Sequence, residues 1–280
     1  MLRIGGPIFN PPADPRELAR AHRQCGYRAA YVPQELSVKD SGAVKAFSAA
    51  FAAEDVALAE AGAWCNLLTP DPVKRAKNFS FVCERLALAD ALGARCCVDY
   101  LGTLDPDSDF GPHPGNLTEA GFERAVATVR SIIDAVKPTR AKFTLEMMQW
   151  ILPDSVELYL RLIRAVERRA FGVHLDPVNL VLTPRMYFDT GSLLRHCFQQ
   201  LGPQIASCHA KDLTLRNALA LHLDEVPPGK GNMDYETFLS ELARLPGEVP
   251  LMLEHLSTAD EYAAAYRHLA SVAQKLKISL

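Results

Sequence analysis

The sequence lacks several features that mark common classes of protein. It has no long basic run and a net charge of −3, so nothing indicates a surface for nucleic acid. Charged residues interrupt every apolar stretch well before it could cross a bilayer. Seven cysteines without a CxxC pair are typical of reduced thiols in a cytoplasmic protein. Residues 1–12 contain no basic segment followed by a sustained apolar stretch, so we expect no signal peptide.

A linker rich in glycine, proline or serine is also lacking, and no change of composition divides the chain. Strand-like and helix-like segments instead alternate throughout, which gives eight strands. Such alternation implies parallel strands with right-handed crossovers, and 280 residues suit a barrel. An open doubly wound sheet would need a glycine-rich phosphate loop, but Gly5 and Gly6 lack the GxGxxG spacing. We therefore predict an α/β protein with a single (β/α)8 TIM barrel domain over residues 1–280.

Local signals set the bounds of these segments. Asp14 before Pro15 is typical of a helix start, and Gly26 is typical of a helix end. The expected strands are Leu2–Phe9, Ala29–Val32, Ala63–Leu68, Arg95–Tyr100, Phe143–Glu146, Phe171–Asp176, Ile205–His209 and Pro250–Glu254. The expected helices are Pro15–Cys25, Val44–Ala61, Lys74–Leu92, Thr118–Val136, Ser155–Arg168, Gly191–Leu201 and Ala259–Lys277. Residues 213–245 form the longest connection.

The last four expected strands each end in a residue type that binds metals. These residues are Glu146, Asp176, His209 and Glu254, at spacings of 30, 33 and 45 residues, which each leave room for one helix. A barrel of parallel strands brings all four ends to one rim. Carboxylates with an imidazole suit a divalent cation that takes mixed oxygen and nitrogen ligands. Taken singly, each residue could be a helix cap, a turn former or a structural histidine, but their joint occurrence favours a metal centre in an enzyme.

The alternation of side chains along a strand supports this interpretation. Glu146 shares its face with Thr144, Asp176 with His174, His209 with Ser207 and Lys211, and Glu254 with Met252. His174 should therefore lie one layer below Asp176, where it either orients a ligand or is a hydrogen-bonded core histidine. Lys211 should lie one layer nearer the mouth than His209. Asp212 and His255 have the opposite parity, and we assign neither to the metal.

Five segments carry a resemblance to a known family. They are Thr144-Leu-Glu146, Gly172-Val-His-Leu-Asp-Pro-Val-Asn179, Cys208-His-Ala-Lys-Asp212, Gly229-Lys-Gly-Asn-Met-Asp-Tyr235 and Leu253-Glu254. Through them the chain resembles the xylose-isomerase-like barrels, which include sugar and sugar-phosphate isomerases and epimerases. The resemblance implies one divalent ion, often manganese, with magnesium, cobalt or zinc as alternatives. It implies that Glu146, Asp176, His209 and Glu254 hold this ion.

The implied activity is that of a metal-dependent isomerase or epimerase of a small sugar, keto-sugar or polyol derivative. A cation chelated by a carbonyl and a hydroxyl makes the neighbouring C–H more acidic and stabilises the enediolate. Glu146 and Glu254 are the expected acid/base pair as well as ligands. Lys211, His174 and Asn179 are the expected substrate-binding residues. For Lys211, an ion pair with Glu254 or another rim carboxylate is an equal alternative.

The chain departs from the subfamilies in ways that leave the substrate open. Asn179 stands where ketose 3-epimerases have a histidine, and Leu215, with Arg216 next to it, stands where they have an arginine. Met148 stands where dehydroshikimate dehydratases have a histidine. DNA-repair endonucleases of this fold need additional histidines on early strands, and expected strands two to four have none.

Two other functions remain as alternatives. One is a metal-dependent lyase or dehydratase that uses the same site on a keto-polyol, and the other is a non-catalytic sugar-binding barrel subunit. The expected partner is a small carbohydrate, without nucleic acid or membrane, and a homo-oligomer is one option. The loop 105–115, which contains His113, is either a lid or a dimer contact. Trp150 either lines the pocket or lies in the core, and polar residues at other strand ends (Gln34, Glu35, Asn66 and Asp99) either touch substrate hydroxyls or are solvated.

Overall fold

The computed structural model describes residues 1–280 and confirms the predicted barrel. Eight parallel strands close in the order β1-β10-β7-β6-β5-β4-β3-β2, which is chain order apart from an inserted two-stranded sheet, β8-β9. The barrel strands are β1 (Arg3–Gly5), β2 (Ala29–Tyr31), β3 (Ala57–Gly62), β4 (Cys96–Asp99), β5 (Lys142–Glu146), β6 (Phe171–Leu175), β7 (Ile205–Ala210) and β10 (Pro250–Leu253). The inserted pair is β8 (Asp212–Leu215) and β9 (Leu223–Val226), and it is antiparallel.

Helices follow the strands, and the residues that cap them are of types that favour helix ends. Asp14 accepts hydrogen bonds from the backbone N–H groups of Arg16 and Glu17, as predicted from its place before Pro15. Thr258 and Glu261 form a reciprocal capping box at the last helix. The helices are α1 (Pro15–Gln24), α2 (Ser41–Ala53), α3 (Pro72–Leu92), α4 (Glu119–Val136), α5 (Val156–Val166), α6 (Pro184–Tyr187), α7 (Thr190–Leu201), α8 (Tyr235–Arg244) and α9 (Ala259–Lys275), with short 3-10 helices at Pro114–Leu117, Pro177–Leu180 and Gly202–Gln204. None of the helices is long and apolar enough to span a bilayer.

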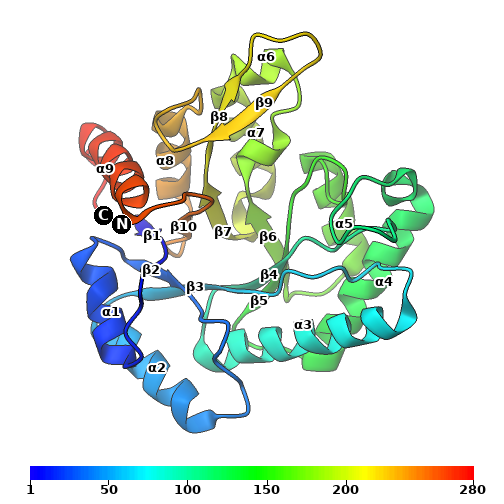
Figure 1. Cartoon of the computed structure of the whole chain (residues 1–280), viewed down its shortest axis with the longest axis horizontal. Coiled ribbons are helices and arrows are strands. Elements are labelled where there is room, and N and C mark those ends of the chain that lie inside the picture. The colour runs from blue at the N-terminus through cyan, green and yellow to red at the C-terminus, as the bar shows by residue number, and fades with distance from the viewer. The chain divides into compact units, whose positions relative to one another are not determined.

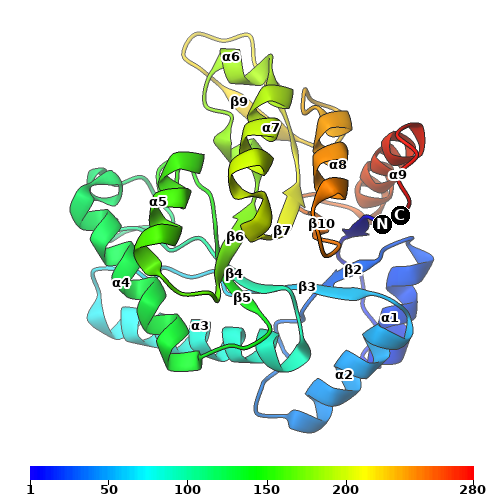
Figure 2. The same cartoon turned by 180° about the vertical axis from the view of Figure 1, so that it is seen from behind.

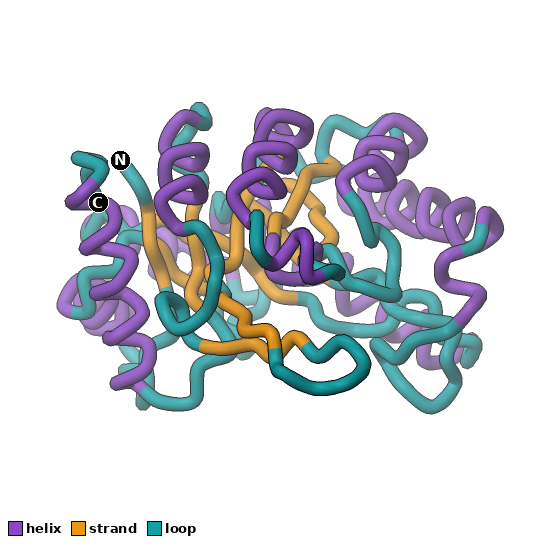
Figure 3. Tube along the Cα trace, turned by 90° about the horizontal axis from the view of Figure 1, so that it is seen from above, coloured by secondary structure: helices purple, strands orange, loops and turns teal.

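Two compact units make up the chain. The first contains residues Met1–Ala30, Ala50–Ala57 and Leu175–Leu280, and in it α7 packs on α8 and α8 on α9 (Figure 1). The second contains Tyr31–Ala49 and Leu58–His174, and in it α3 packs on α4 and α4 on α5 (Figure 2). Within the first unit, the β8-β9 hairpin continues from the end of β7 (Figure 3).

One strand lies elsewhere than the sequence predicted. The expected helix 44–61 ends at Ala53, β3 occupies Ala57–Gly62, and the expected strand 63–68 is a loop. The backbone turns at Asp55, which has a φ of 52°. Arg3 fixes this turn, because its guanidinium donates to the Asp55 carbonyl at 3.2 Å and to the Asp55 carboxylate at 3.0 Å. A contact across 52 residues overrides the helical preference of the alanines that follow.

Candidate metal centre

Three of the four predicted metal ligands lie in contact within the first unit. Asp176 directly follows β6, His209 lies in β7, and Glu254 directly follows β10. His209 Nδ1 is 2.9 Å from Glu254 Oε1 and 3.6 Å from Asp176 Oδ2. The side chains of Asp176 and His209 are fully buried, and that of Glu254 is 14% exposed. Two carboxylates and an imidazole at these distances form a donor set that suits a divalent cation.

Strand register explains this convergence. In the parallel pair β7–β10, Met252 lies opposite His209 and Leu253 opposite Ala210. Glu254 therefore follows at the level of Lys211, and side chains two residues apart share a face. The predicted parity of Lys211 with His209 is consistent with this register.

Lys211 forms ion pairs with two of the four predicted ligands. Its Nζ lies 2.8 Å from Asp176 Oδ2 and also contacts Glu254 Oε1. The ion pair with Glu254, one of the two roles that the sequence left open, is therefore present. An ammonium group buried to 3% exposure supplies the positive charge that two neighbouring carboxylates require in a poorly solvated place.

The same contacts determine the charge of Glu254. Burial raises the pKa of this carboxyl group, but the charge of His209, its hydrogen bond to Glu254 and the charge of Lys211 outweigh burial. The pKa of Glu254 is lowered from 4.5 to about 2. Glu254 is therefore ionised at neutral pH, the state that both a ligand and a general base need.

A loop built around Asp212 holds Lys211 in place. The Asp212 carboxylate accepts hydrogen bonds from four backbone N–H groups, those of Leu213, Gly229, Gly231 and Met233, at 2.8–3.0 Å. Glycine is required at residue 231, since a Cβ there would lie 2.2 Å from the carbonyl oxygen of Leu213. Asp212 therefore serves the loop, and its exclusion from the metal ligands stays a prediction.

Tyr235, the last residue of the motif 229–235, connects this loop to the end of β7. Tyr235 begins α8, and its hydroxyl donates to the backbone carbonyl of Lys211 at 2.7 Å. Asp234 caps α8 by accepting from the N–H of Thr237 at 3.0 Å. The backbone of Lys211, whose side chain contacts Asp176 and Glu254, is thus fixed by the glycines, the aspartate and the tyrosine of residues 229–235.

Glu146, the remaining predicted ligand, belongs to the second unit. It is the last residue of β5 and is 6% exposed. Its Cα partner on β6 is His174, two residues before Asp176 in the chain. His174 is fully buried, and its Nδ1 lies 3.2 Å from Glu60 Oε2. Glu60 was missed because it lies in the alanine-rich stretch that the sequence assigned to a helix.

Other predicted residues occupy structural positions at the strand ends. Asn179 is 9% exposed and lies in the 3-10 helix that follows Asp176. In the second unit, Asn66 links two loops, because its amide donates to Thr103 O at 2.9 Å and its oxygen accepts from Thr103 N at 2.9 Å. Asp99 is fully buried and accepts from the N–H groups of Cys65 and Tyr100. The substrate contacts expected of Asn179 and His174 stay predictions.

The loop 105–115 and Trp150 contact each other. The indole Nε1 of Trp150 donates to the carbonyl of Phe110 at 2.6 Å. His113 caps the following 3-10 helix, since its Nδ1 accepts from the N–H of Gly115 at 3.1 Å. Tyr100 extends the aromatic contacts, with its ring 6.3 Å from that of Phe110. The roles of this loop as a lid or as a dimer contact stay predictions.

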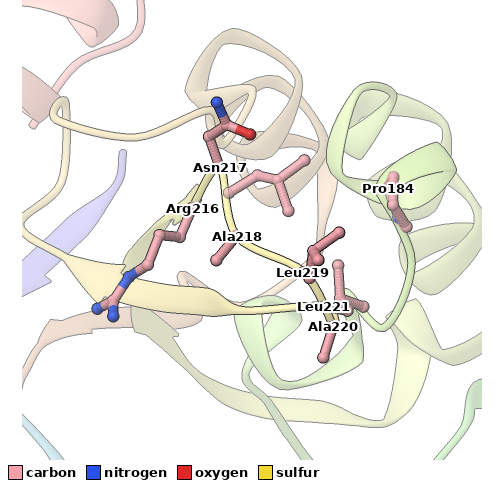
Figure 4. Close-up of a pocket in the computed structure, with 8 residues that line it drawn as sticks. Pro184, Arg216, Asn217, Ala218, Leu219, Ala220 and Leu221 are labelled. Atoms are coloured by element: carbon pink, nitrogen blue, oxygen red, sulfur yellow. The ribbon is translucent and has the colours of Figure 1, made fainter.

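A separate cavity of about 540 Å³ lies at the tip of the β8-β9 hairpin, lined by Pro184 and residues 215–221 (Figure 4). Its walls are mostly alanine and leucine side chains, and they include no histidine, cysteine, aspartate or glutamate. Arg216 points away from Leu219 and Leu221, and its Nε donates to Asp224 at 2.8 Å. This cavity is therefore distinct from the candidate metal centre.

Comparison with known proteins gives a family match over most of the chain. The family model described as xylose isomerase-like TIM barrel matches residues 19–272. No curated protein matches the sequence significantly.

Several solved structures have the same fold at low sequence identity. The 3-keto-D-glucoside 4-epimerase of E. coli has a TM-score of 0.70 and 12% identity, over 98% of this chain and all of that one. A xylose isomerase-like TIM barrel protein of Mycobacterium smegmatis, in complex with magnesium, has a TM-score of 0.68 and 16% identity, over 99% and 97%. Endonuclease IV of Thermus thermophilus has a TM-score of 0.72 and 14% identity, over 98% and 99%.

Proposed function

Because the chain belongs to the xylose isomerase-like TIM barrel family, we propose that it is a divalent-metal-dependent isomerase or epimerase. Its substrate would be a small sugar, keto-sugar or polyol derivative. The observation that carries the proposal is the contact among Asp176, His209 and Glu254, with Glu254 held ionised. The solved structures of the same fold include an epimerase from E. coli and a magnesium-bound protein, which is in keeping with this proposal.

Glu146 completes the proposed ligand set. With Asp176, His209 and Glu254 it supplies oxygen and nitrogen atoms that could hold one metal ion. Glu146 lies opposite His174 in the parallel pair β5–β6. His174 is two residues before Asp176 in the chain, and this placement supports the assignment. Manganese is the first choice of metal, and magnesium, cobalt and zinc are the alternatives.

The cation and the side chains would have different roles in the proposed reaction. A bound divalent cation polarises a substrate carbonyl and acidifies the adjacent C–H. Glu254, ionised at neutral pH, can accept that proton, and Glu146 can donate or accept a proton at the other side of the substrate. Lys211 contributes positive charge next to the site, where it can hold a substrate oxygen. His174 and Asn179 are the further proposed substrate-binding residues.

The likeness to endonuclease IV concerns the fold alone. A nuclease would need a positively charged surface for the phosphate backbone, and this chain has a net charge of −3. Between β2 and β5 the only histidine is His113, which caps a 3-10 helix. We therefore propose no nuclease activity.

Proton exchange tests the proposed reaction. The Mn2+-loaded protein is incubated with a panel of ketoses and keto-glycosides in D2O and followed by NMR. We expect deuterium at a carbon next to the carbonyl of one substrate, together with an epimer or a shifted carbonyl. An enone absorbance would replace the proposal by the lyase alternative. Tight binding without exchange or turnover would replace it by a sugar-binding role.

A further inference from the structure

Three side chains that can bind a metal lie together inside the second unit, and none of them belongs to the ligand set proposed above. They are Glu60 on β3, Cys96 on β4 and His174 on β6, with exposures of 1%, 0% and 0%. One potential ligand atom from each lies within 4.8 Å of the other two. The proposed function uses neither Glu60 nor Cys96.

Strand register places the three side chains on one face of the sheet. Glu60 and Cys96 are Cα partners on neighbouring parallel strands, so their side chains project to the same side. The register continues through Val98 opposite Thr144 and through Glu146 opposite His174. Because alternate residues share a face, His174 projects to the same side as Cys96.

The distance between two of the groups fits a shared cation. His174 Nδ1 lies 3.2 Å from Glu60 Oε2. Two ligand atoms that each lie about 2.0–2.1 Å from a tetrahedral zinc ion are about 3.3–3.4 Å apart. The pair thus has the spacing of two neighbouring zinc ligands.

The chemistry of the trio differs from that of the oxygen-rich centre. We propose that Glu60, Cys96 and His174 bind a second divalent cation, of the zinc type. Thiolate sulfur favours zinc over manganese and magnesium, and carboxylate and imidazole complete a ligand set that zinc accepts. A thiolate, a carboxylate and a neutral imidazole carry two negative charges, which a divalent ion neutralises. A neutral complex suits a place without solvent, where an uncompensated charge is strongly disfavoured.

The second centre joins three strands of the second unit. The cation bridges β3, β4 and β6 and fixes the ring of His174 next to Glu146, its partner on β5. It also explains the presence of three ionisable groups in a barrel interior, where aliphatic side chains would otherwise pack. One water molecule enclosed with the cation would complete the four positions that zinc prefers.

Cobalt substitution tests this centre through a signal that oxygen and nitrogen ligands do not give. Because the trio is buried, Co2+ is supplied during expression, before the fold closes. A cobalt–thiolate bond produces a charge-transfer absorption band in the near ultraviolet, and we expect this band in the wild-type protein. Cobalt-loaded wild-type protein without the band would overturn the proposal, whatever the fate of any variant.

Variants then assign the band to its residue. Cys96→Ser should lose the band and about one equivalent of cobalt per chain. The matched control is Cys97→Ser, since Cys97 is equally buried but projects from the opposite face. It should keep both band and cobalt. A band that survives in Cys96→Ser, or that disappears in Cys97→Ser alone, would contradict the assignment to Cys96.

Two further variants separate this centre from the proposed active site. Asp176→Asn should keep the thiolate band and lose only the metal of the oxygen-rich centre. Glu60→Gln should lower the cobalt bound with the band even if Cys96→Ser fails to fold. If Asp176→Asn abolishes the band, there is one centre and the proposal fails. If it changes neither cobalt content nor band, the ligand set proposed for catalysis fails while the second centre stands.

Discussion

The position of Glu254 after its strand determines the charge of its side chain. His209 and Lys211 hold its pKa at about 2, and its strand register places it beside both. Glu146 is the last residue of β5, as Glu254 directly follows β10. The two carboxylates are therefore alike in their placement at strand ends.

Substituting either carboxylate by its amide should impair turnover. We expect Glu146→Gln and Glu254→Gln each to lower kcat at least about a hundredfold, because each removes a proton acceptor. Saturating metal should keep the melting temperature close to that of the wild type. The control is Glu236→Gln, which removes a surface ion pair with Lys275 and should retain activity. Full activity in one catalytic variant would exclude that residue from proton transfer.

Lys211 and His209 should give different phenotypes. Lys211→Met should retain metal, because it removes an ammonium group that competes for Asp176 and Glu254, and it should raise KM or lower kcat. His209→Ala should lose metal, since it removes a direct ligand. Metal content measured by mass spectrometry, next to steady-state kinetics, distinguishes the two. Loss of metal in Lys211→Met would give the side chain a supporting role in the metal centre instead.

Asp99 should make the protein less stable as pH rises. Burial raises the pKa of Asp99 to about 8, although two backbone hydrogen bonds lower it. Between pH 3.8 and about 8, the folded state keeps a proton that the unfolded state has released. The free energy of unfolding therefore falls with pH in this window, by at most about 1.4 kcal/mol per unit from this group.

Asp99→Asn should remove this dependence. Its amide oxygen can still accept from Cys65 and Tyr100, so the variant should be more stable than the wild type at pH 8 and equal to it near pH 4. Denaturant unfolding across this range measures the difference. Asp90→Asn is the control, because three backbone hydrogen bonds lower the pKa of Asp90 despite its burial; this group titrates below pH 3.8, so its substitution should leave the slope between pH 4 and 8 unchanged. A wild-type slope that Asp99→Asn leaves unchanged would refute the assignment.

At the scale of elements, the connection from β7 to α8 depends on one carboxylate. Asp212 accepts four backbone hydrogen bonds, and Asp212→Ala would leave these N–H groups without their acceptor. We expect a loss of at least about 3 kcal/mol in the free energy of unfolding, and lower activity through Lys211. Asp224→Ala, which breaks an exposed ion pair on the same hairpin, should cost less than about 1 kcal/mol. Equal losses in both variants would argue against the central position of Asp212.

Seven barrel strands could be placed from the sequence because each signal was local. Apolar runs bounded by glycines, and caps such as Asp14, depend on neighbouring residues alone. The third strand, Ala57–Gly62, could not be placed in this way, because its start depends on the contact of Arg3 with Asp55. The β8-β9 hairpin was also missed, since the sequence showed only a long connection there.

The candidate centre was predictable to a similar extent. Period-two parity sufficed to bring Asp176, His209 and Glu254 to one place, while Asp212 accepts hydrogen bonds from its loop. Glu60 was not predictable, because its partner His174 is more than a hundred residues away and its strand was assigned to a helix. A single charge in the alternation Ala-Leu-Ala-Glu-Ala-Gly was the available signal for a buried strand with a functional residue.

At the scale of the whole molecule, the proposed ligand set draws on both compact units. Asp176, His209 and Glu254 come from the first, and Glu146 comes from the second. Barrels of this kind carry their sites at the carboxyl ends of the strands, where all four residues stand. The proposal therefore requires these four strand ends to meet at one cation.

Anomalous diffraction from crystals grown with Mn2+ tests this requirement most directly. We predict an anomalous peak within about 2.0–2.3 Å of carboxylate oxygens of Glu146, Asp176 and Glu254 and of one imidazole nitrogen of His209. Lys211 should lie outside the coordination sphere. A peak bound by other residues, a peak without Glu146, or four well-ordered side chains without a peak would contradict the account.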